Sequence, residues 1–211
     1  MDESIKTDRL GAEDSTEQRI FEAARDIFIQ KGMEGAKMQE IADRAGLNKA
    51  LLHYYYRSKE KLFEMVARSI INRAIPVIRK TIESDEPLHQ KIAGFIDFYI
   101  NLINHNPFVP LFIVSEMNKH PDSFYEKIMP IGVPKPQIFL KQVEEAIERG
   151  EIKPIKPEHL LINVVSMCVF PFLGKPMLRI VLSMDSAELK QFYDERTEVV
   201  KQFVFAALRP D

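Results

Sequence analysis

The stretch that decides the fold is Gly32–Phe63, which reads GMEGAKMQEIADRAGLNKALLHYYYRSKEKLF. Its apolar positions predict a short helix over Met38–Ala45 and a second over Lys49–Tyr55. Gly46 supplies the backbone freedom that a tight turn between them needs, and Asn48 is a favourable N-cap for the second helix. Two short helices joined in this way form a helix-turn-helix, whose second helix is shaped to enter the major groove of DNA.

The second helix of this pair has an inner and an outer face. Leu52 and Tyr55 can face inward, against the preceding helices, and the residues that can face outward are Lys49, Ala50, Leu51, His53 and Tyr54. Lysine donates to phosphates or guanine edges, whereas tyrosine and histidine can reach phosphate oxygens or stack on sugars and thymine methyl groups. Core packing is the alternative role for the tyrosines, and His53 can also be a neutral wall of the groove.

Helices are expected on both sides of this motif. The preceding one should begin near Ser15, where Ser15 and Gln18 have capping-box spacing, and should stop at Gly32. The following one should be capped by Ser58, with Lys59 in its first turn. The helix dipole alone disfavours a cation at that place, so Lys59 is expected to serve a phosphate.

Charge is unevenly distributed along the 211 residues, which carry 29 basic and 31 acidic side chains and a net charge of −2. Residues 36–68 contain seven basic and four acidic side chains, a net charge of +3, so the remainder carries −5. A basic segment in an acidic protein is typical of an anion-binding module joined to a different module. Chance clustering on a solvated face is the alternative, and charge alone does not separate the two.

The quoted pattern resembles the DNA-binding domain of the TetR (tetracycline-repressor) family, over roughly residues 15–65. The resemblance implies an all-α homodimer in the bacterial cytoplasm that binds a palindromic operator under the control of a small-molecule effector. We therefore expect a disordered tail over residues 1–14, a three-helix helix-turn-helix DNA-binding domain over 15–65, and a C-terminal helical ligand-binding and dimerisation domain over 66–211.

By position, the resemblance assigns phosphate contacts to Lys37, Tyr54 and Lys59, and base-edge or groove contacts to Lys49, Ala50, Leu51 and His53. Three departures from the family pattern bear on these contacts. Lys37 stands where the family often has threonine, Leu51 stands where it commonly has a small hydroxyl residue, and the usual Tyr-His order is inverted in His53-Tyr54. These departures leave the base sequence of the operator unpredictable.

Helical patterns also fill the remaining two thirds of the chain. The helix after Ser58 should continue to Pro76, where it should kink or break. Further helices are expected at about residues 85–106, 107–120, 137–149, 158–172 and 186–208, and four prolines break residues 121–136 into turns and loop. No strand pattern of any length is present, so the predicted fold class is all-α.

The last two of these helices are candidates for a subunit interface. The helix over residues 158–172 is apolar nearly all round, and the one over 186–208 needs a surface to pack against. A four-helix interface between two subunits meets both needs, which predicts interface positions at Leu161, Val165, Cys168, Phe192, Val199 and Phe203. Core packing within one chain is the alternative.

An effector pocket is the least specific prediction. Aromatic and methionine side chains able to line an apolar cavity are Phe95, Phe98, Tyr99, Phe112, Met117, Phe139 and Met167. Each of them can equally be a core residue. We expect an apolar or amphipathic ligand, and nothing in the sequence identifies it.

Several classes of function lack support in the sequence. The five histidines are scattered with no pair at ligand spacing, glycine-rich phosphate or dinucleotide motifs are missing, and Cys168 lies in an apolar run, so we expect no metal, no cofactor and no enzyme. The longest apolar run, over 160–173, is too short and interrupted to span a membrane. A single cysteine fits a reducing cytoplasm. The sequence thus predicts a DNA-binding repressor, with an all-α ligand-binding or carrier protein that lacks DNA binding as the alternative.

Overall fold

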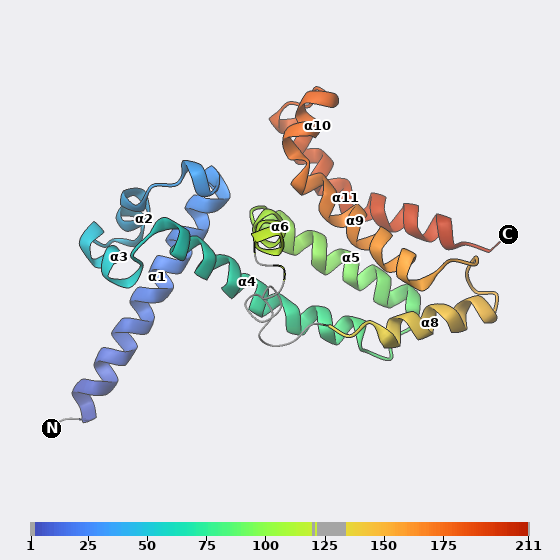
Figure 1. Cartoon of the computed structure of the whole chain (residues 1–211), viewed down its shortest axis with the longest axis horizontal. Helices are drawn as coiled ribbons and strands as arrows, with labels where there is room; N and C mark the ends of the chain where they lie inside the picture. The colour runs from blue at the N-terminus through green and yellow to red at the C-terminus, as the bar shows by residue number, and fades with distance from the viewer. Residues whose placement is uncertain (1–2, 120, 122–133, 211) are drawn as a thin grey trace. The chain divides into compact units, whose positions relative to one another are not determined.

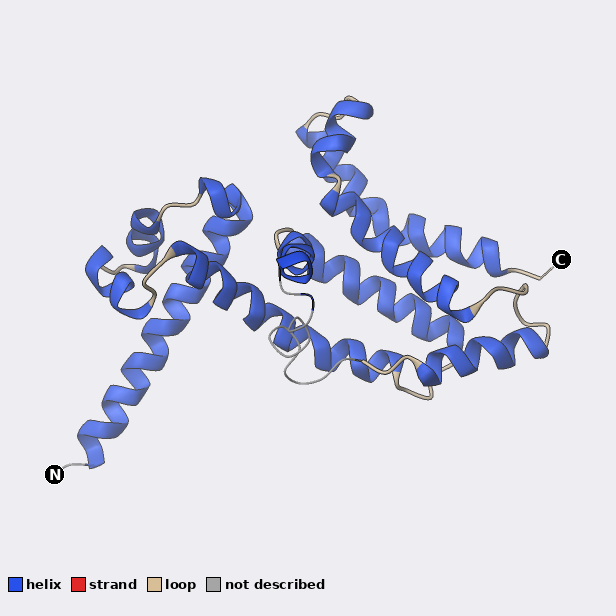
Figure 2. Cartoon of the chain, in the orientation of Figure 1, coloured by secondary structure: helices blue, strands red, loops and turns tan. Residues whose placement is uncertain are grey.

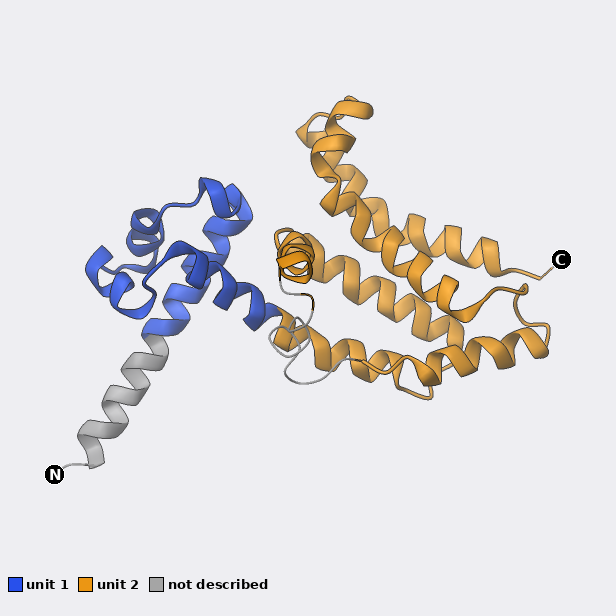
Figure 3. Cartoon of the chain, in the orientation of Figure 1, with its two compact units in different colours: residues 1–70 blue, residues 71–211 orange. Residues whose placement is uncertain are grey.

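A computed structural model of the chain describes residues 3–119, 121 and 134–210, with side chains from Thr16 onward. The chain divides into two compact units, residues 1–70 and 71–211 (Figure 3). Within the described ranges the regular elements are helices and there is no strand (Figure 2), which confirms the predicted all-α class. The predicted 15–65 and 66–211 domains stay a prediction about function, since compactness alone assigns no role to either unit.

The first helix, α1, spans Glu3–Gly35 and differs from the prediction at its start. The helix begins at Glu3 and not near Ser15, whereas the disordered tail over 1–14 stays a prediction. The residues before Ser15 include several good helix formers and no proline, so nothing there forces a break. The predicted end is better placed, because Gly32 has φ 66° and ψ −179° and interrupts the regular helix.

The helix-turn-helix is confirmed in its local geometry. Helix α2 spans Met38–Ala45 and α3 spans Lys49–Tyr55. Between them Gly46 is left-handed, with φ 66° and ψ 37°, and the amide of Leu47 donates to the carbonyl of Ala42 at 2.9 Å. The side chain of Asn48 accepts a hydrogen bond of 2.7 Å from the amide of Leu51, which is the expected N-cap.

The interior of the N-terminal unit joins α1, α2, α3 and the first half of α4. Fully buried apolar side chains include Ile20, Ala24, Phe28, Ile41, Ala42, Leu52, Leu62 and Val66. The rings of Phe28 and Phe63 meet edge to face with centroids 4.9 Å apart. Burial of side chains of this size stabilises the unit by about 1.5–3 kcal/mol each.

Polar contacts fix α2 against α1 at both ends. The guanidinium of Arg19 donates to the carbonyl oxygens of Ala45 and Gly46 at the C-terminal end of α2. Arg44 pairs with Asp26 of α1. At the other end of α2, the Nζ of Lys31 lies 2.9 Å from the Oε1 of Glu40.

Helix α4 spans Lys59–Ile82 and crosses the boundary between the two units. Its N-cap is as expected, because the Oγ of Ser58 accepts a hydrogen bond of 3.2 Å from the amide of Lys61. The helix continues through Pro76 for another turn and a half, so of the predicted kink or break the break is wrong, and the kink stays a prediction. A proline removes one backbone donor, and the rest of the helix makes its own hydrogen bonds on either side.

The C-terminal unit is a helical bundle (Figure 1). Its helices are α5 (Leu88–His105), α6 (Val109–Lys119), α8 (Gln137–Glu148), α9 (Pro157–Leu173), α10 (Lys175–Val181) and α11 (Ser186–Leu208). Helix α5 packs against α8, α9 and α11. The start of α11 is confirmed by a capping box between Asp185 and Glu188. Helix α10 was not expected, and most of the proline-broken segment over 121–136 lies outside the described residues.

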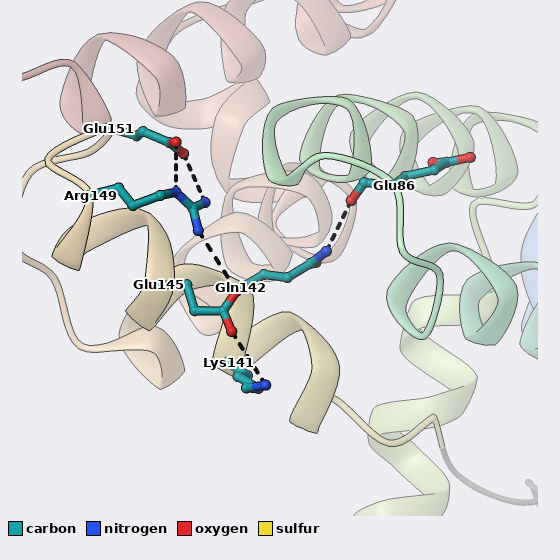
Figure 4. A network of polar contacts seen from close by, with 6 residues as sticks. All are labelled: Glu86, Lys141, Gln142, Glu145, Arg149 and Glu151. Atoms are coloured by element: carbon teal, nitrogen blue, oxygen red, sulfur yellow. Dashed lines mark hydrogen bonds and ion pairs between the residues drawn. The ribbon is translucent and has the colours of Figure 1, made fainter.

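A buried lysine of α5 forms hydrogen bonds with the end of α4, the residues that follow it, and α8. Lys91 of α5 is 1% exposed, and its ammonium donates to the carbonyls of Ile82 and Ser84, at 3.0 and 2.5 Å, and to Oε1 of Gln142 at 2.6 Å. Gln142 in turn donates to the carbonyl of Glu86 (Figure 4). Burial lowers the pKa of Lys91, and the nearby acidic side chains oppose that effect. The ammonium therefore satisfies carbonyls at the C-terminal end of α4 that no helix amide reaches.

No single helix in the described ranges is long and apolar enough to cross a membrane. The bent pair Pro157–Leu173 and Lys175–Val181, with 74° between its halves, meets the length and composition criteria when its members are taken together.

We expect the substitution Gly46→Ala to lower the free energy of unfolding by about 1–2 kcal/mol, because a Cβ is disfavoured in a left-handed residue and would lie 3.0 Å from the Arg19 guanidinium. Gly94→Ala is the matched control, since Gly94 lies inside α5 and a Cβ there meets nothing within 4 Å. That variant should gain about 0.5–1 kcal/mol. Urea unfolding followed by circular dichroism measures both, and equal effects of the two substitutions would contradict the assignment.

Candidate nucleic-acid interface

The outer face of α3 is open to solvent at every predicted contact position. Lys49, Ala50, Leu51, His53 and Tyr54 are all exposed, and the Tyr54 side chain is 80% exposed. On the opposite side Leu52 is fully buried and Tyr55 is half-buried. The division into an inner and an outer face is therefore as the sequence predicts, while contact with DNA stays a prediction.

Local contacts hold α3 in a fixed orientation. Asn48 caps its first turn, and the amide of Tyr56 donates to the carbonyl of Leu52 at 2.8 Å at its end. The rings of Tyr54 and Tyr55 meet edge to face, with centroids 5.7 Å apart. Burial raises the pKa of the Tyr56 hydroxyl, and the Glu17 carboxylate adds to that effect, so Tyr56 belongs to the inner side.

Lys37 lies at the N-cap of α2, where its backbone is extended and its side chain is exposed. The carboxylate of Glu40, one turn into the helix, is occupied by another cation. The hydrogen bond from Lys31 lowers the pKa of Glu40 most, and the charge of Lys37 lowers it further. Because Glu40 is engaged by Lys31, the Lys37 side chain can extend away from α2 toward an anion.

Lys59 has a partner that the sequence did not reveal. Its ammonium donates to the carbonyl of Glu34 at 3.3 Å, at the C-terminal end of α1. At the N-terminal end of α4, the backbone amide of Glu60 and the hydroxyl of Ser58 lower the pKa of the Glu60 carboxylate. Lys59 therefore already stabilises a carbonyl end within the protein, and its predicted contact with phosphate is an additional role.

The predicted interface residues of α9 and α11 fall into three groups. Val199 and Phe203 are 46% and 67% exposed, whereas Leu161, Val165 and Phe192 are half-buried. Cys168 is wrong as an interface residue, because it is fully buried within its own chain. It shares the inner face of α9 with Leu160, Val164 and Phe172, and burial raises the pKa of its thiol to about 12.

Sequence reasoning missed the exposed apolar residues next to these positions. Ile162 and Phe170 of α9 are 59% and 53% exposed, and each lies two positions from residues of the inner face. Ile180 and Val181 of the unexpected helix α10 are 78% and 69% exposed. The apolar character of 158–172 was visible in the sequence, but which side faces the core depends on packing against α5 and α8.

Most of the side chains predicted to line an effector pocket lie in the interior of the C-terminal unit. Phe95, Phe112 and Phe139 are buried, and Phe98, Tyr99 and Met167 are half-buried. Phe95 and Phe139 border a void of about 20 Å³ beside Lys91, which has room for about one water molecule. Met117 lies on the surface with 48% of its area exposed. Its assignment to an effector pocket stays a prediction.

Aromatic packing explains why these residues form core. The rings of Phe95 and Tyr99 stack with centroids 5.2 Å apart, and desolvation raises the pKa of the Tyr99 hydroxyl to about 12. Two larger cavities open elsewhere in the same unit. One of about 780 Å³ has polar walls from α5, α10 and α11, and one of about 350 Å³ has apolar walls where α5 begins and α11 ends.

Comparison with known proteins agrees with the geometry of the N-terminal unit. Residues 20–66 match the family model of bacterial regulatory proteins of the tetR family. The HTH-type transcriptional regulator RutR of Escherichia coli K12 is 25% identical over 204 residues, covering 96% of this chain and 94% of that protein. The HTH-type transcriptional repressor NicS of Pseudomonas putida KT2440 is 27% identical over 192 residues, covering 83% and 84%.

Solved structures share the fold over nearly the whole chain. HlyIIR, a hemolysin II transcriptional regulator, superposes with a TM-score of 0.57 at 22% identity, covering 94% of this chain and 99% of that one. The putative regulator SCO4942 of Streptomyces coelicolor gives a TM-score of 0.56 at 20% identity, covering 93% and 99%. At these identities the likeness establishes the fold alone. Together with the match of residues 20–66 to the family model, these findings indicate a DNA-binding transcriptional regulator that is similar to those of the tetR family.

Proposed function

We propose that this regulator is a homodimeric repressor of the bacterial cytoplasm that binds a palindromic operator and is controlled by a small-molecule effector. The observation that carries the proposal is the outer face of α3, exposed at every contact position while Leu52 anchors its inner face. In this proposal the phosphate contacts are made by Lys37, Tyr54 and Lys59, and the groove contacts by Lys49, Ala50, Leu51 and His53.

The case for a dimer comes from an apolar surface that the described residues of the chain leave exposed to solvent. Large apolar side chains are exposed on three neighbouring helices, α9, α10 and α11, and they are Ile162, Phe170, Ile180, Val181, Val199 and Phe203. Exposed apolar patches larger than a few hundred Å² are uncommon on monomers and usually mark an interaction site. A second copy with the same surface can cover this one symmetrically.

A dimer also supplies the affinity that one α3 lacks. A single helix of seven residues with one lysine makes few phosphate contacts. Two copies held about 34 Å apart read two half-sites in successive major grooves, and their contacts add. A palindromic operator follows from the two-fold symmetry of such a dimer.

Repression is supported by the relative NicS, whose name describes it as a repressor. FasR of Mycolicibacterium smegmatis, 26% identical over a shorter alignment of 93 residues, is described as an activator. The longer alignment favours repression for this chain. A reporter gene behind the selected operator, measured with and without the regulator, tests the direction of control.

Sequence selection from a random duplex library should yield a palindrome whose half-sites are about one helical turn apart. The variants Lys49→Ala and His53→Ala should shift the base preference within each half-site, because these side chains face the groove in the proposal. Ala substitution of the exposed Arg179, on α10, is the control. A library that returns no enriched sequence would contradict the operator, and unchanged preference in both variants would contradict their role.

We expect Lys59→Ala to weaken operator binding several-fold regardless of sequence, and to reduce the slope of log K against log salt by about one. Fluorescence anisotropy titrations at several salt concentrations measure both quantities. The control is Lys141→Ala, which removes an exposed lysine of the C-terminal unit that pairs with Glu145. An unchanged slope in Lys59→Ala would show that this lysine serves only its contact with Glu34.

The substitution Phe203→Glu should convert the dimer to a monomer at micromolar concentration, because it places a charge in the middle of the apolar surface. Leu111→Glu is matched in exposure, since Leu111 is 64% and Phe203 67% exposed, and it lies on α6 outside that surface. Sedimentation velocity should show a dimer for the wild type and for Leu111→Glu. A wild-type monomer, or an unaffected Phe203→Glu dimer, would place the interface elsewhere.

A further inference from the structure

A cavity of about 350 Å³ lies where α5 begins and α11 ends, away from the predicted effector pocket. None of the seven side chains predicted to line that pocket borders it. Its apolar walls come from the start of α5, the end of α8, the loop that follows α8 and the end of α11, and they are Pro87, Leu88, Ile92, Ala146, Ile152, Phe205 and Leu208. Its size and its mainly apolar lining are typical of small-molecule sites.

The floor of this cavity is part of the packed core. Ile92, Ala146 and Leu208 are 3%, 1% and 6% exposed. The end of α11 is held in place because the amide of Lys153 donates to the carbonyl of Leu208 at 3.0 Å. The cavity is thus formed by fixed backbone segments and buried side chains.

One side of the rim is aromatic. The rings of His89 and Phe205 stack with centroids 3.7 Å apart and an interplanar angle of 16°. This stack joins the first turn of α5 to the last turns of α11. An aromatic rim of this kind presents a flat apolar surface beside a polar ring edge.

Among the described residues, the charged groups at the rim leave one cation, Arg209, without a partner. Glu151 is held by Arg149, with Nε–Oε1 and Nη2–Oε2 distances of 2.7 and 3.0 Å (Figure 4). That hydrogen bonding lowers the pKa of Glu151 and occupies its carboxylate. Arg209 also lines the cavity, and it has no ion pair or hydrogen bond with any residue that the structure describes. The rim therefore offers an unpaired guanidinium above an apolar floor.

We propose that this cavity binds a small apolar monocarboxylate, with its hydrocarbon part against the floor and its carboxylate on Arg209. The volume equals that of about twelve water molecules in the liquid, at roughly 30 Å³ each, which suits a medium-length acyl chain or an aryl acid. The apolar walls provide no partners for a second charge, so polyanions are disfavoured. The proposal deepens the effector part of the proposed function and rests on it for its regulatory meaning, whereas binding itself needs no DNA.

Calorimetric titration of the full chain without DNA tests the binding, with octanoate, octanol and octylamine as probes. Octanoate should bind saturably, octanol about tenfold more weakly because it lacks the carboxylate, and octylamine more weakly still because its charge repels Arg209. No saturable octanoate binding would overturn the site. Equal affinity for octanoate and octanol, or tighter binding of octylamine, would overturn the role of the cation.

Variants separate the cation from the apolar floor. Arg209→Ala should weaken octanoate about tenfold and leave octanol unchanged, and Arg209→Lys should retain part of the preference for octanoate. Arg179→Ala removes an exposed guanidinium outside this cavity and should bind like the wild type. An equal loss in Arg179→Ala, or none in Arg209→Ala, would contradict the assignment.

Leu88→Trp should block both octanoate and octanol by filling the cavity from the half-buried start of α5. Circular dichroism and the thermal midpoint show whether Leu88→Trp is folded. If Leu88→Trp is not folded, the octanoate affinity of Arg209→Ala decides the test. A folded Leu88→Trp that binds octanoate normally would place the ligand elsewhere. If the protein binds octanoate but selects no operator, the proposed function is overturned and this ligand site stands. If it selects an operator but does not bind octanoate, the ligand site is overturned and the DNA-binding function stands.

Discussion

The presentation of α3 depends on the closure of α2 by Arg19. The last carbonyls of a helix have no hydrogen-bond donor within that helix. Here the guanidinium of Arg19 donates to the carbonyl oxygens of Ala45 and Gly46. Charge-assisted hydrogen bonds of this kind contribute about 1.5–3 kcal/mol when buried, and less where solvent screens them. The left-handed Gly46 lets the chain reverse directly after these carbonyls, so the turn and its clamp form one unit.

This turn determines which side chains of α3 face solvent. With α2 fixed on α1, Leu52 is placed in the core and every residue on the opposite side of α3 is left outside. The C-terminal unit differs from the N-terminal one, because the surface that it exposes on α9, α10 and α11 is apolar. A repressor needs both features, since an exposed reading helix binds tightly only when a second copy is held beside it.

Local signals were readable from the sequence, and long-range packing was not. The turn at Gly46, the N-cap at Asn48 and the capping box of Asp185 and Glu188 involve residues within a few positions of one another, so residue type and spacing were sufficient. The break expected at Pro76 did not occur, because a helix tolerates one missing donor when both of its ends are held by packing. Cys168 was placed at the interface because an all-round apolar helix does not reveal which side its own bundle covers.

The candidate ligand site illustrates the same limit. Aromatic residues in α5 and α8 suggested a pocket, and two of them, Phe95 and Tyr99, stack on each other in the structure. The cavity proposed as the ligand site is formed by segments from opposite ends of the C-terminal unit, including residues 87–92 and 205–209. No spacing rule connects segments so far apart, and Arg209 became a candidate only because the fold brings it to the same cavity as residues 87–92.

The most direct test of the central claim is photo-cross-linking from a photo-reactive phenylalanine analogue at position 54, on the exposed face of α3. With the protein bound to its selected duplex, the account predicts a cross-link to DNA from this position, and none from the same analogue at the exposed position 114 of α6. A protein that retains the duplex but gives no cross-link from position 54 would contradict the claim that this face of α3 contacts DNA.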